Sequence, residues 1–283
     1  MTRLAVVTIA HGRHQHLARQ QRALGASTRP PDEWVVVSMA DPVLDEWGGV
    51  ARDGVVPRVV RVPESPLGLP LAAARNAGAA AAIEGGAEVL VFLDVDCLPH
   101  PEALAAYESV VTERPRSIWS GPVTYLPDGL SDDQLREPWE LDDPHPARPA
   151  PEPGEVVEDA DPRLFWSLSF AVSASTWRDV GGFCEEYVGY GGEDTDFAMT
   201  ADSRGVGLGW VGAARAYHQW HPTTSPPVHH AEDIVRNATI FHGRWGWWPM
   251  EGWLDAMAER GAVRRDGDRW VLGSAVREEA SGG

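Results

Sequence analysis

Short apolar runs alternate with amphipathic and alanine-rich stretches through the first hundred residues of the chain. The runs are typical of strands covered on both faces, and they span Leu4–Ile9, Trp34–Ser38, Val56–Val62 and Val89–Leu93. Between them the sequence predicts helices over His14–Leu24 and Leu69–Ile83, and another that opens at Pro101. Strands that alternate with helices indicate a doubly wound, mostly parallel sheet, so we expect an α/β fold.

The alternation is lost after a further strand expected over Ser117–Tyr125. Residues 126–162 hold twelve acidic residues against Arg136 and Arg148, together with many prolines, so −10 of the formal net charge of −18 lies there. A long polar connection inside a compact domain is either a functional lid or disordered, and both interpretations stay open.

Regular structure is predicted again from residue 164. In chain order we expect a strand over Leu164–Ala174, a short helix over Trp177–Val180, strands over Val206–Gly212 and Ala216–Tyr217, helices over Ala231–His242 and Trp253–Arg260, and a frayed tail.

The chain of 283 residues is strongly acidic, with 42 Asp and Glu against 24 Lys and Arg. Nucleic acids and anionic membrane surfaces bind basic patches, so this balance argues against both as partners. Two cysteines make no disulfide framework, and the first apolar run is too short for a signal peptide or a membrane span. We therefore expect a cytoplasmic protein, peripheral to a membrane only if its substrate is a lipid.

Two carboxylates directly follow the apolar run Val89–Leu93: Asp94 and Asp96 stand in VFLDVDCLPHP. Open α/β sheets bind ligands at the carboxyl ends of their strands. Residues i and i+2 of an extended chain point to the same side, and two like charges held close together call for a shared cation. Oxygen ligands suit a hard divalent ion, so the sequence predicts a metal site, with an acidic surface turn as the alternative.

A second acidic cluster follows about ninety residues later, in GYGGEDTD over residues 189–196. Gly191 and Gly192 permit a tight turn and a close approach to a ligand, while Glu193 and Asp194 load the first turn of an expected helix. Acids at such a position can be simple helix capping. A carboxylate beside a glycine-rich loop is also well placed as a general base toward a substrate hydroxyl.

Four stretches together resemble the GT-A fold nucleotide-sugar glycosyltransferases, in particular the family 2 enzymes and the galactosyltransferase and polysaccharide-polymerase groups with a Gly-Gly-Glu-Asp motif. They read VVTIAHGRHQHL, ARNAG, FLDVDCLPHP and WRDVGGFCEEYVGYGGEDTDFAM, in the expected order over roughly residues 3–220. The resemblance implies four parts: a nucleotide-sugar-binding half (1–125), an acidic Pro-rich loop or lid (126–163), an acceptor-binding and catalytic half (164–225), and a C-terminal helical extension and tail (226–283).

The resemblance also implies a metal-dependent, inverting transfer of a sugar from a nucleoside diphosphate sugar, with UDP preferred, to a hydroxyl acceptor. Mn²⁺ or Mg²⁺ would be held by Asp96, with Asp94 touching the ribose or the metal and His218 as a further ligand, for which His221 competes. The ion would offset the charge that develops on the leaving nucleoside diphosphate. The other donor contacts implied are Thr8, Asp41, Arg75, Asn76 and Val95.

On the acceptor side, the resemblance implies that Asp194 is the catalytic base and that Glu193 binds the acceptor or supports the base. An acid at Asp194, where related retaining enzymes often have Asn, favours inversion. Tyr190 takes the place usually held by Trp and could stack on a sugar face. The acceptor would be a sugar, a lipid-linked molecule or a small molecule with a hydroxyl group, contacted by Trp166, Tyr190, Gly191, Gly192, Glu193 and Trp220.

Three other functions compete with a glycosyltransferase. A sugar nucleotidyltransferase would need a basic, Gly-rich triphosphate loop, and IAHGRHQH is a poor one. A glycosidase could use paired carboxylates but would leave the Asp94–Asp96 pair and His218 without a role. A carbohydrate-binding protein with a degenerate transferase fold would not need these residues, and their presence argues for an enzyme.

Overall fold

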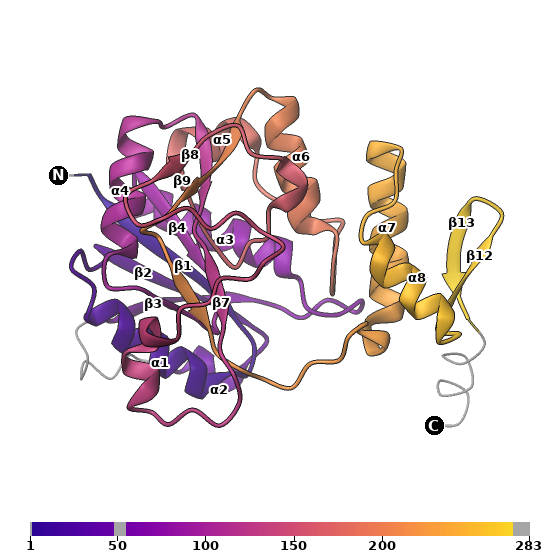
Figure 1. Cartoon of the computed structure of the whole chain (residues 1–283), viewed down its shortest axis with the longest axis horizontal. Coiled ribbons are helices and arrows are strands. Elements are labelled where there is room, and N and C mark those ends of the chain that lie inside the picture. The colour runs from indigo at the N-terminus through magenta and orange to yellow at the C-terminus, as the bar shows by residue number, and fades with distance from the viewer. Residues whose placement is uncertain (1, 48–54, 274–283) are drawn as a thin grey trace.

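The computed structural model describes residues 2–47 and 55–273, and its centre is an eight-stranded sheet with helices on both faces (Figure 1). Its strands are β1 Leu4–Ala10, β2 Glu33–Met39, β3 Pro57–Val62, β4 Val89–Leu93, β6 Ser117–Ser120, β8 Val156–Val157, β9 Ser169–Ser173 and β10 Gly207–Val211. They lie in the order β3-β2-β1-β4-β9-β6-β10-β8, in which β9 is antiparallel to both of its neighbours. The predicted α/β fold with a mostly parallel sheet is confirmed.

Helices cover the two faces of this sheet in two groups. On one face α1 (His14–Gly25), α2 (Pro42–Asp45) and α4 (Ala103–Glu113) bury their apolar residues. On the other face lie α3 (Leu71–Glu84), α5 (Ala174–Val180) and α6 (Glu193–Ser203). A Cβ at Gly78 of α3 would overlap Val7 and Val37, so this glycine lets the helix pack directly on β1 and β2.

The segment predicted as one strand over 117–125 is two strands in two sheets, which corrects the prediction. β6 stays in the main sheet, whereas β7 (Val123–Tyr125) joins a second sheet with β5 (Cys97–Pro99) and β11 (Ala216–His218). The strand is interrupted at Gly121 and Pro122. A Cβ at Gly121 would overlap the Ala214 carbonyl oxygen. Proline cannot donate to a ladder, so the first strand ends here.

The acidic segment 126–163 packs against the rest of the protein. It contains 3-10 turns at Gln134–Arg136, Pro138–Leu141 and Pro162–Leu164, and β8, which pairs with the end of β10. Ion pairs join it to the rest of the protein, with N–O distances of 2.7 Å each for Arg215 with Asp142 and Arg19 with Asp132, and 3.4 Å for Arg114 with Glu158. The strand predicted to begin at Leu164 begins only at Ser169, as β9, because the last 3-10 turn occupies residues 162–164.

The C-terminal extension packs as a unit beside α6 and apart from the main sheet (Figure 1). It consists of α7 (Ala231–Trp245), α8 (Glu251–Glu259) and a hairpin of β12 (Val263–Asp266) and β13 (Arg269–Leu272), with an apolar cluster of its own. The hairpin corrects the expectation of a frayed tail up to residue 273; residues 274–283 lie outside the described part. None of the described helices is long and apolar enough to span a membrane.

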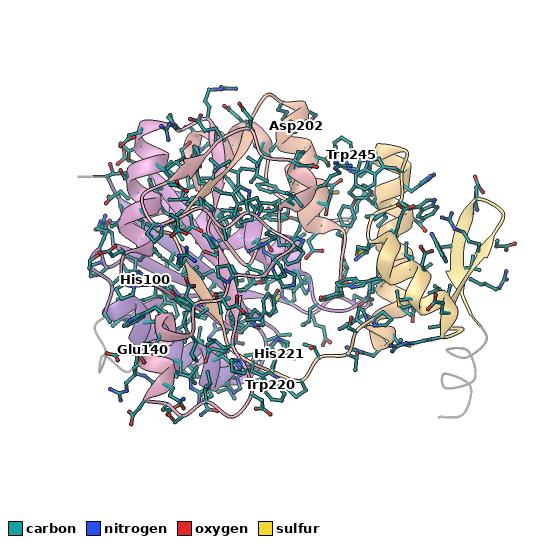
Figure 2. All side chains as sticks on the ribbon, viewed as in Figure 1. His100, Glu140, Asp202, Trp220, His221 and Trp245 are labelled. Atoms are coloured by element: carbon teal, nitrogen blue, oxygen red, sulfur yellow. The ribbon has the colours of Figure 1, made fainter. Side chains whose placement is uncertain are left out.

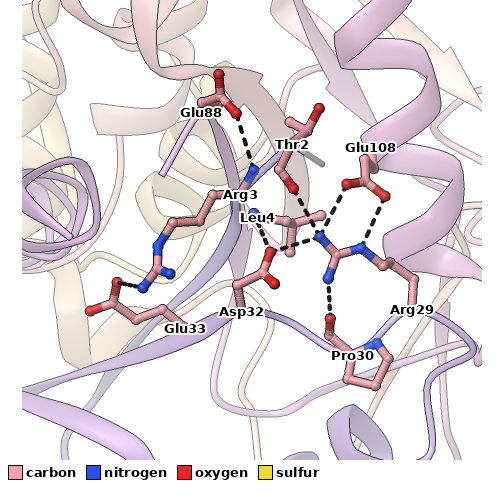
Figure 3. A network of polar contacts seen from close by, with 9 residues as sticks. All are labelled: Thr2, Arg3, Leu4, Arg29, Pro30, Asp32, Glu33, Glu88 and Glu108. Carbon is pink, nitrogen blue, oxygen red and sulfur yellow. Dashed lines mark hydrogen bonds and ion pairs between the residues drawn. The ribbon is translucent and has the colours of Figure 1, made fainter. Parts of the chain in front are cut away.

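A polar network closes the amino-terminal edge of the sheet, opposite to the carboxyl ends of the parallel strands (Figure 3). The guanidinium of Arg29 donates to Glu108 of α4 at 3.0 and 3.1 Å and to Asp32 at 2.7 Å. Asp32 in turn accepts from the backbone N–H of Leu4 at 2.8 Å. The network therefore holds α4 against the beginnings of β1 and β2.

Candidate functional site

Asp94 and Asp96 follow β4 at the carboxyl end of the parallel strands. The chain does not stay extended there, because the backbone N–H of Cys97 donates to the Asp94 carbonyl oxygen at 2.9 Å and closes a turn. The two carboxylates consequently take different partners: Arg75 for Asp94 and two histidines for Asp96. The expectation that both point to one side of an extended chain is therefore wrong.

Asp96 lies between His218 and His221. Its Oδ1 is 3.2 Å from Nε2 of His218, and its Oδ2 is 3.3 Å from Nε2 of His221. One atom of each residue falls within 4.8 Å of the others, so the three could hold a metal ion, and Asp94 stands outside this group. We call Asp96, His218 and His221 the carboxylate–histidine triad.

Two groups of this triad have shifted pKa values. Burial opposes ionisation of Asp96, but the hydrogen bond from His221 and the charges of both histidines hold the pKa of the carboxyl below its usual value. Burial lowers the pKa of His218. An ionised carboxylate and a neutral imidazole are the forms that bind divalent metals.

The second sheet carries His218 to this position. In β11, His218 lies opposite Cys97 of β5 and opposite Tyr125 of β7, whose ring stacks on the imidazole at a centroid distance of 4.6 Å. His221 follows β11 and lies beside Trp220 (Figure 2). The structure thus brings together both histidines that the sequence left as alternatives.

A second cluster surrounds Arg75 of α3, which is 5% exposed. Its guanidinium lies 3.3 Å from Asp94, 3.5 Å from Glu193 and 4.0 Å from Asp194. Burial raises the pKa of Glu193 to about 7, with the charge of Asp194 acting in the same direction. Burial likewise raises the pKa of Asp94 to about 7, although Arg75 opposes the shift. Three carboxylates share one buried cation, so the cluster is short of positive charge.

The glycine loop before α6 positions two of these acids. Gly191 and Gly192 have φ values of +94° and +91°, a conformation that favours glycine. α6 begins at Glu193, so the acids occupy its first turn as predicted. Asp194 accepts a hydrogen bond at Oδ2 from the backbone N–H of Ser167 at 2.9 Å. Its Oδ1 has no hydrogen-bond partner among the described residues.

Three residues expected to contact the donor have other partners. Thr8 is fully buried in β1, and its hydroxyl donates to Gln20 at 2.8 Å, so it does not reach the surface of the site. Asp41 caps α2 and accepts from the Gly12 N–H at 2.7 Å. Asn76 exchanges two hydrogen bonds, each of 2.9 Å, with the backbone of Phe183.

Val95, the fourth residue expected to contact the donor, packs against the apolar cluster between the sheet and α4.

The aromatic candidates for the acceptor lie in different settings. Tyr190 stacks on His230 and on Trp253 of the C-terminal extension, at centroid distances of 4.7 and 5.7 Å. Trp220 is 44% exposed.

Sequence reasoning missed a basic cleft of about 310 Å³ beside the triad. Arg13, His16 and Arg19 line it from α1 and the preceding loop, together with Trp220, His221 and one acid, Asp128; Arg19 is paired with Asp132. The available signal was the run HGRHQHLAR, which concentrates three histidines and two arginines in an otherwise acidic chain. This cleft could accept an anionic ligand next to a metal ion.

Residues 160–221 match a family described as the N-terminal domain of galactosyltransferase. The matched stretch contains the glycine loop, Asp194 and both histidines of the triad. Two curated relatives are the validoxylamine A glucosyltransferases of Streptomyces hygroscopicus subsp. limoneus and subsp. jinggangensis (strain 5008), 28% and 27% identical over 225 residues. Each alignment covers 72% of this chain and 48% or 52% of the relative, so the chain spans about half the length of these relatives.

Solved structures share the fold at low sequence identity. GalNAc-T7 with UDP, GalNAc and Mn²⁺ has a TM-score of 0.57 at 15% identity, covering 92% of this chain and 57% of that one. S. aureus TarS (residues 1–349) with UDP-GlcNAc has a TM-score of 0.55 at 12% identity, covering 92% and 80%. The predicted GT-A fold is confirmed, and the family match and the named relatives agree with the prediction of a glycosyltransferase.

Proposed function

We propose that this chain is a metal-dependent, inverting glycosyltransferase that moves a sugar from a nucleoside diphosphate sugar, with UDP preferred, to a hydroxyl acceptor. The observation that carries the proposal is that the carboxylate–histidine triad includes Asp96, two residues after Asp94, while Arg75 contacts both Asp94 and Asp194, at 3.3 and 4.0 Å. The relatives are named glucosyltransferases, and solved neighbours contain UDP or UDP-GlcNAc, which supports this donor class.

Asp96, His218 and His221 would hold the divalent ion. The residues fit this role, because the buried carboxylate of Asp96 lies 3.2 and 3.3 Å from the two imidazole nitrogens, and such oxygen and nitrogen atoms are donors that a divalent ion takes. Two imidazole nitrogens suit a transition metal such as Mn²⁺ better than Mg²⁺, and the GalNAc-T7 neighbour contains Mn²⁺. A bound ion would offset the negative charge on the diphosphate leaving group.

Asp194 is the proposed base. The Ser167 N–H fixes one carboxylate oxygen; the other lies 4.0 Å from Arg75 without a hydrogen-bond partner among the described residues and would accept from the acceptor hydroxyl. Asp194 takes the hydroxyl proton while the acceptor oxygen attacks the anomeric carbon and the bond to the diphosphate breaks. Attack opposite to the leaving group inverts the anomeric centre.

Glu193 and Asp94 would bind hydroxyl groups of the substrates next to Asp194. With a pKa of about 7, part of the Glu193 population is protonated at neutral pH and can donate a hydrogen bond as well as accept one. Arg75 holds both carboxylates in place through the contacts of 3.3 and 3.5 Å.

The basic cleft would receive the diphosphate side of the donor. Arg13 supplies positive charge in a chain whose net charge of −18 repels anions. Both cysteines are free, which suits a cytoplasmic reaction. The acceptor class would be a sugar, a lipid-linked molecule or a small hydroxyl compound.

Release of nucleoside diphosphate from UDP-, GDP- and dTDP-sugars, measured with and without Mn²⁺ and with a panel of hydroxyl acceptors, tests the proposal. We expect release from one donor that needs both the ion and an acceptor, and that is lost in Asp194→Asn. Binding of donor and ion without product from any acceptor would instead identify a degenerate binding protein.

A further inference from the structure

Arg148 is a buried cation without a polar partner. The residue is 6% exposed, and Nε, Nη1 and Nη2 are each buried without a hydrogen bond to any described residue. It lies in the acidic segment 126–163, where acids surround it in the sequence, yet none of them pairs with it. A guanidinium carries five N–H donors, and native proteins rarely bury such groups unsatisfied.

Two tryptophans hold the guanidinium between them. Its central carbon lies 4.8 Å from the ring centre of Trp166 and 5.1 Å from that of Trp210. Trp210 is fully buried and forms the inner wall, while the partly exposed Trp166 forms the outer wall. Cation–π attraction acts on the faces of the guanidinium and leaves its N–H edges unsatisfied, so it offsets only part of the cost of burying the charge.

This clamp adjoins the proposed acceptor side. A row of stacked or edge-on rings runs from the triad to Trp166, with centroid distances of 4.6 Å from His218 to Tyr125, 5.5 Å from Tyr125 to His145 and 5.3 Å from His145 to Trp166. Trp166 directly precedes Ser167, whose N–H binds Asp194. Burial lowers the pKa of Arg148, and the charge of Asp194 is among the influences that oppose this shift.

We propose that Arg148 recognises an anionic group, a carboxylate or a phosphate, on the acceptor, which rests on the proposed function of the same site. The planar fork of a guanidinium binds both groups bidentately. Asp94, Glu193 and Asp194 would repel an anionic acceptor, so a site that accepts one needs a dedicated cation beyond Arg75.

The anion reaches Arg148 when the outer wall opens. The guanidinium nitrogens are covered in this structure, and Trp166 is the partly exposed side of the clamp, so displacement of its ring gives a ligand access to the guanidinium from the outer side. The unpaired charge makes the closed clamp costly, which favours opening once a ligand can pair with it.

Arg148→Met tests the proposal because methionine preserves apolar packing between the tryptophans while it removes the charge. Arg136→Met is the matched control, since Arg136 is the other arginine of residues 126–162 and its side chain is 67% exposed. Melting temperatures would be measured alone and with inorganic phosphate, glucuronate or glucose. We expect Arg148→Met to raise Tm by roughly 2–4 °C, and phosphate or glucuronate to stabilise the wild type and Arg136→Met but not Arg148→Met.

Arg148→Lys provides a second variant, which keeps the charge but loses the fork, and should retain only a fraction of the anion effect. Nucleoside diphosphate release should depend on glucuronate or glucose 6-phosphate more than on glucose. Arg148→Met should reduce that preference in kcat/KM at least tenfold. Whether glucuronate or the phosphate compounds act more strongly identifies the acceptor's anionic group.

Two results would overturn the inference, and a third would separate it from the proposed function. If Arg148→Met lowers Tm and leaves the anion effects unchanged, the clamp is structural. If it abolishes Mn²⁺-dependent UDP binding, Arg148 serves the donor. If the wild type shows no Mn²⁺-dependent UDP binding but an Arg148-dependent anion effect persists, the proposed function fails while the anion site stands.

Discussion

Arg244 at the end of α7 binds Asp196 in the first turn of α6, with Nε 2.7 Å from Oδ1. The Trp245 indole donates to the same oxygen at 2.8 Å and the Tyr187 hydroxyl at 3.1 Å; Figure 2 shows Trp245 at the end of α7 near α6. Asp196 is 1% exposed, so the C-terminal extension supplies two of the three donors to a buried carboxylate. The position of Asp194, two residues earlier, therefore depends on the docking of α7.

Arg244→Met should destabilise the protein by about 2 kcal/mol, because it leaves a buried carboxylate with fewer donors; the partial exposure of Arg244 reduces the effect from that of a fully buried pair. Transfer should fall through kcat, since the first turn of α6 carries the proposed base. Urea unfolding and steady-state kinetics measure the two effects. Arg264→Met, in the exposed hairpin, is the control, and equal stability of both variants would contradict the coupling.

The local pattern of the sequence was sufficient to predict the main strands and helices. Apolar runs and alanine-rich stretches are local signals, and β1, β4 and α3 lie where these signals place them. The break at Gly121 was not predicted, because it depends on the close approach of Ala214, which is distant in sequence. The partner of the Thr8 hydroxyl, Gln20 of α1, was not predicted either, because it too depends on how the helix packs on the sheet.

The site was predictable in its residue types and less so in its pairings. The sequence indicated Asp94, Asp96 and the Gly-Gly-Glu-Asp motif, but the different partners of the two aspartates arise only when α3 and β11 reach the end of β4. The partner of Asp196 lies 48 residues away in the chain. No periodicity or spacing rule connects such positions.

Asp194→Asn should reduce transfer by about 10²–10⁴-fold while donor binding is retained. The amide oxygen can still accept from the Ser167 N–H, so the local structure is preserved while the base is removed. Product formation would be followed under single-turnover conditions, beside titration of the donor. Near-normal turnover in this variant would assign the base to another residue.

His221→Ala should weaken Mn²⁺-dependent UDP binding at least tenfold, which corresponds to about 1.4 kcal/mol. The reason is that His221 would contribute one of the three nitrogen or oxygen ligands of the proposed metal site. Calorimetric titration with and without the ion measures the change. His229→Ala, which alters an exposed histidine bonded to Thr224, serves as the control, and equal affinities of the two variants would remove His221 from the metal site.

Glu193 should make the stability of the protein fall as the pH rises. Burial raises its folded pKa to about 7 from an ordinary value of 4.5, so between these pH values the folded state retains a proton that the unfolded state loses. By linkage, the free energy of unfolding decreases by at most about 3 kcal/mol across that window. Glu193→Gln cannot ionise and should lack this loss.

Chemical unfolding of the wild type and Glu193→Gln between pH 5 and 8 measures this difference. The variant should gain stability relative to the wild type toward pH 8, where the buried carboxylate is ionised and competes with Asp94 and Asp194 for Arg75. Glu186→Gln, at an exposed position in the same loop, controls for the loss of one acid from the chain. A constant difference across the pH range would mean that Glu193 is already ionised at pH 5, and that Arg75 compensates its burial fully.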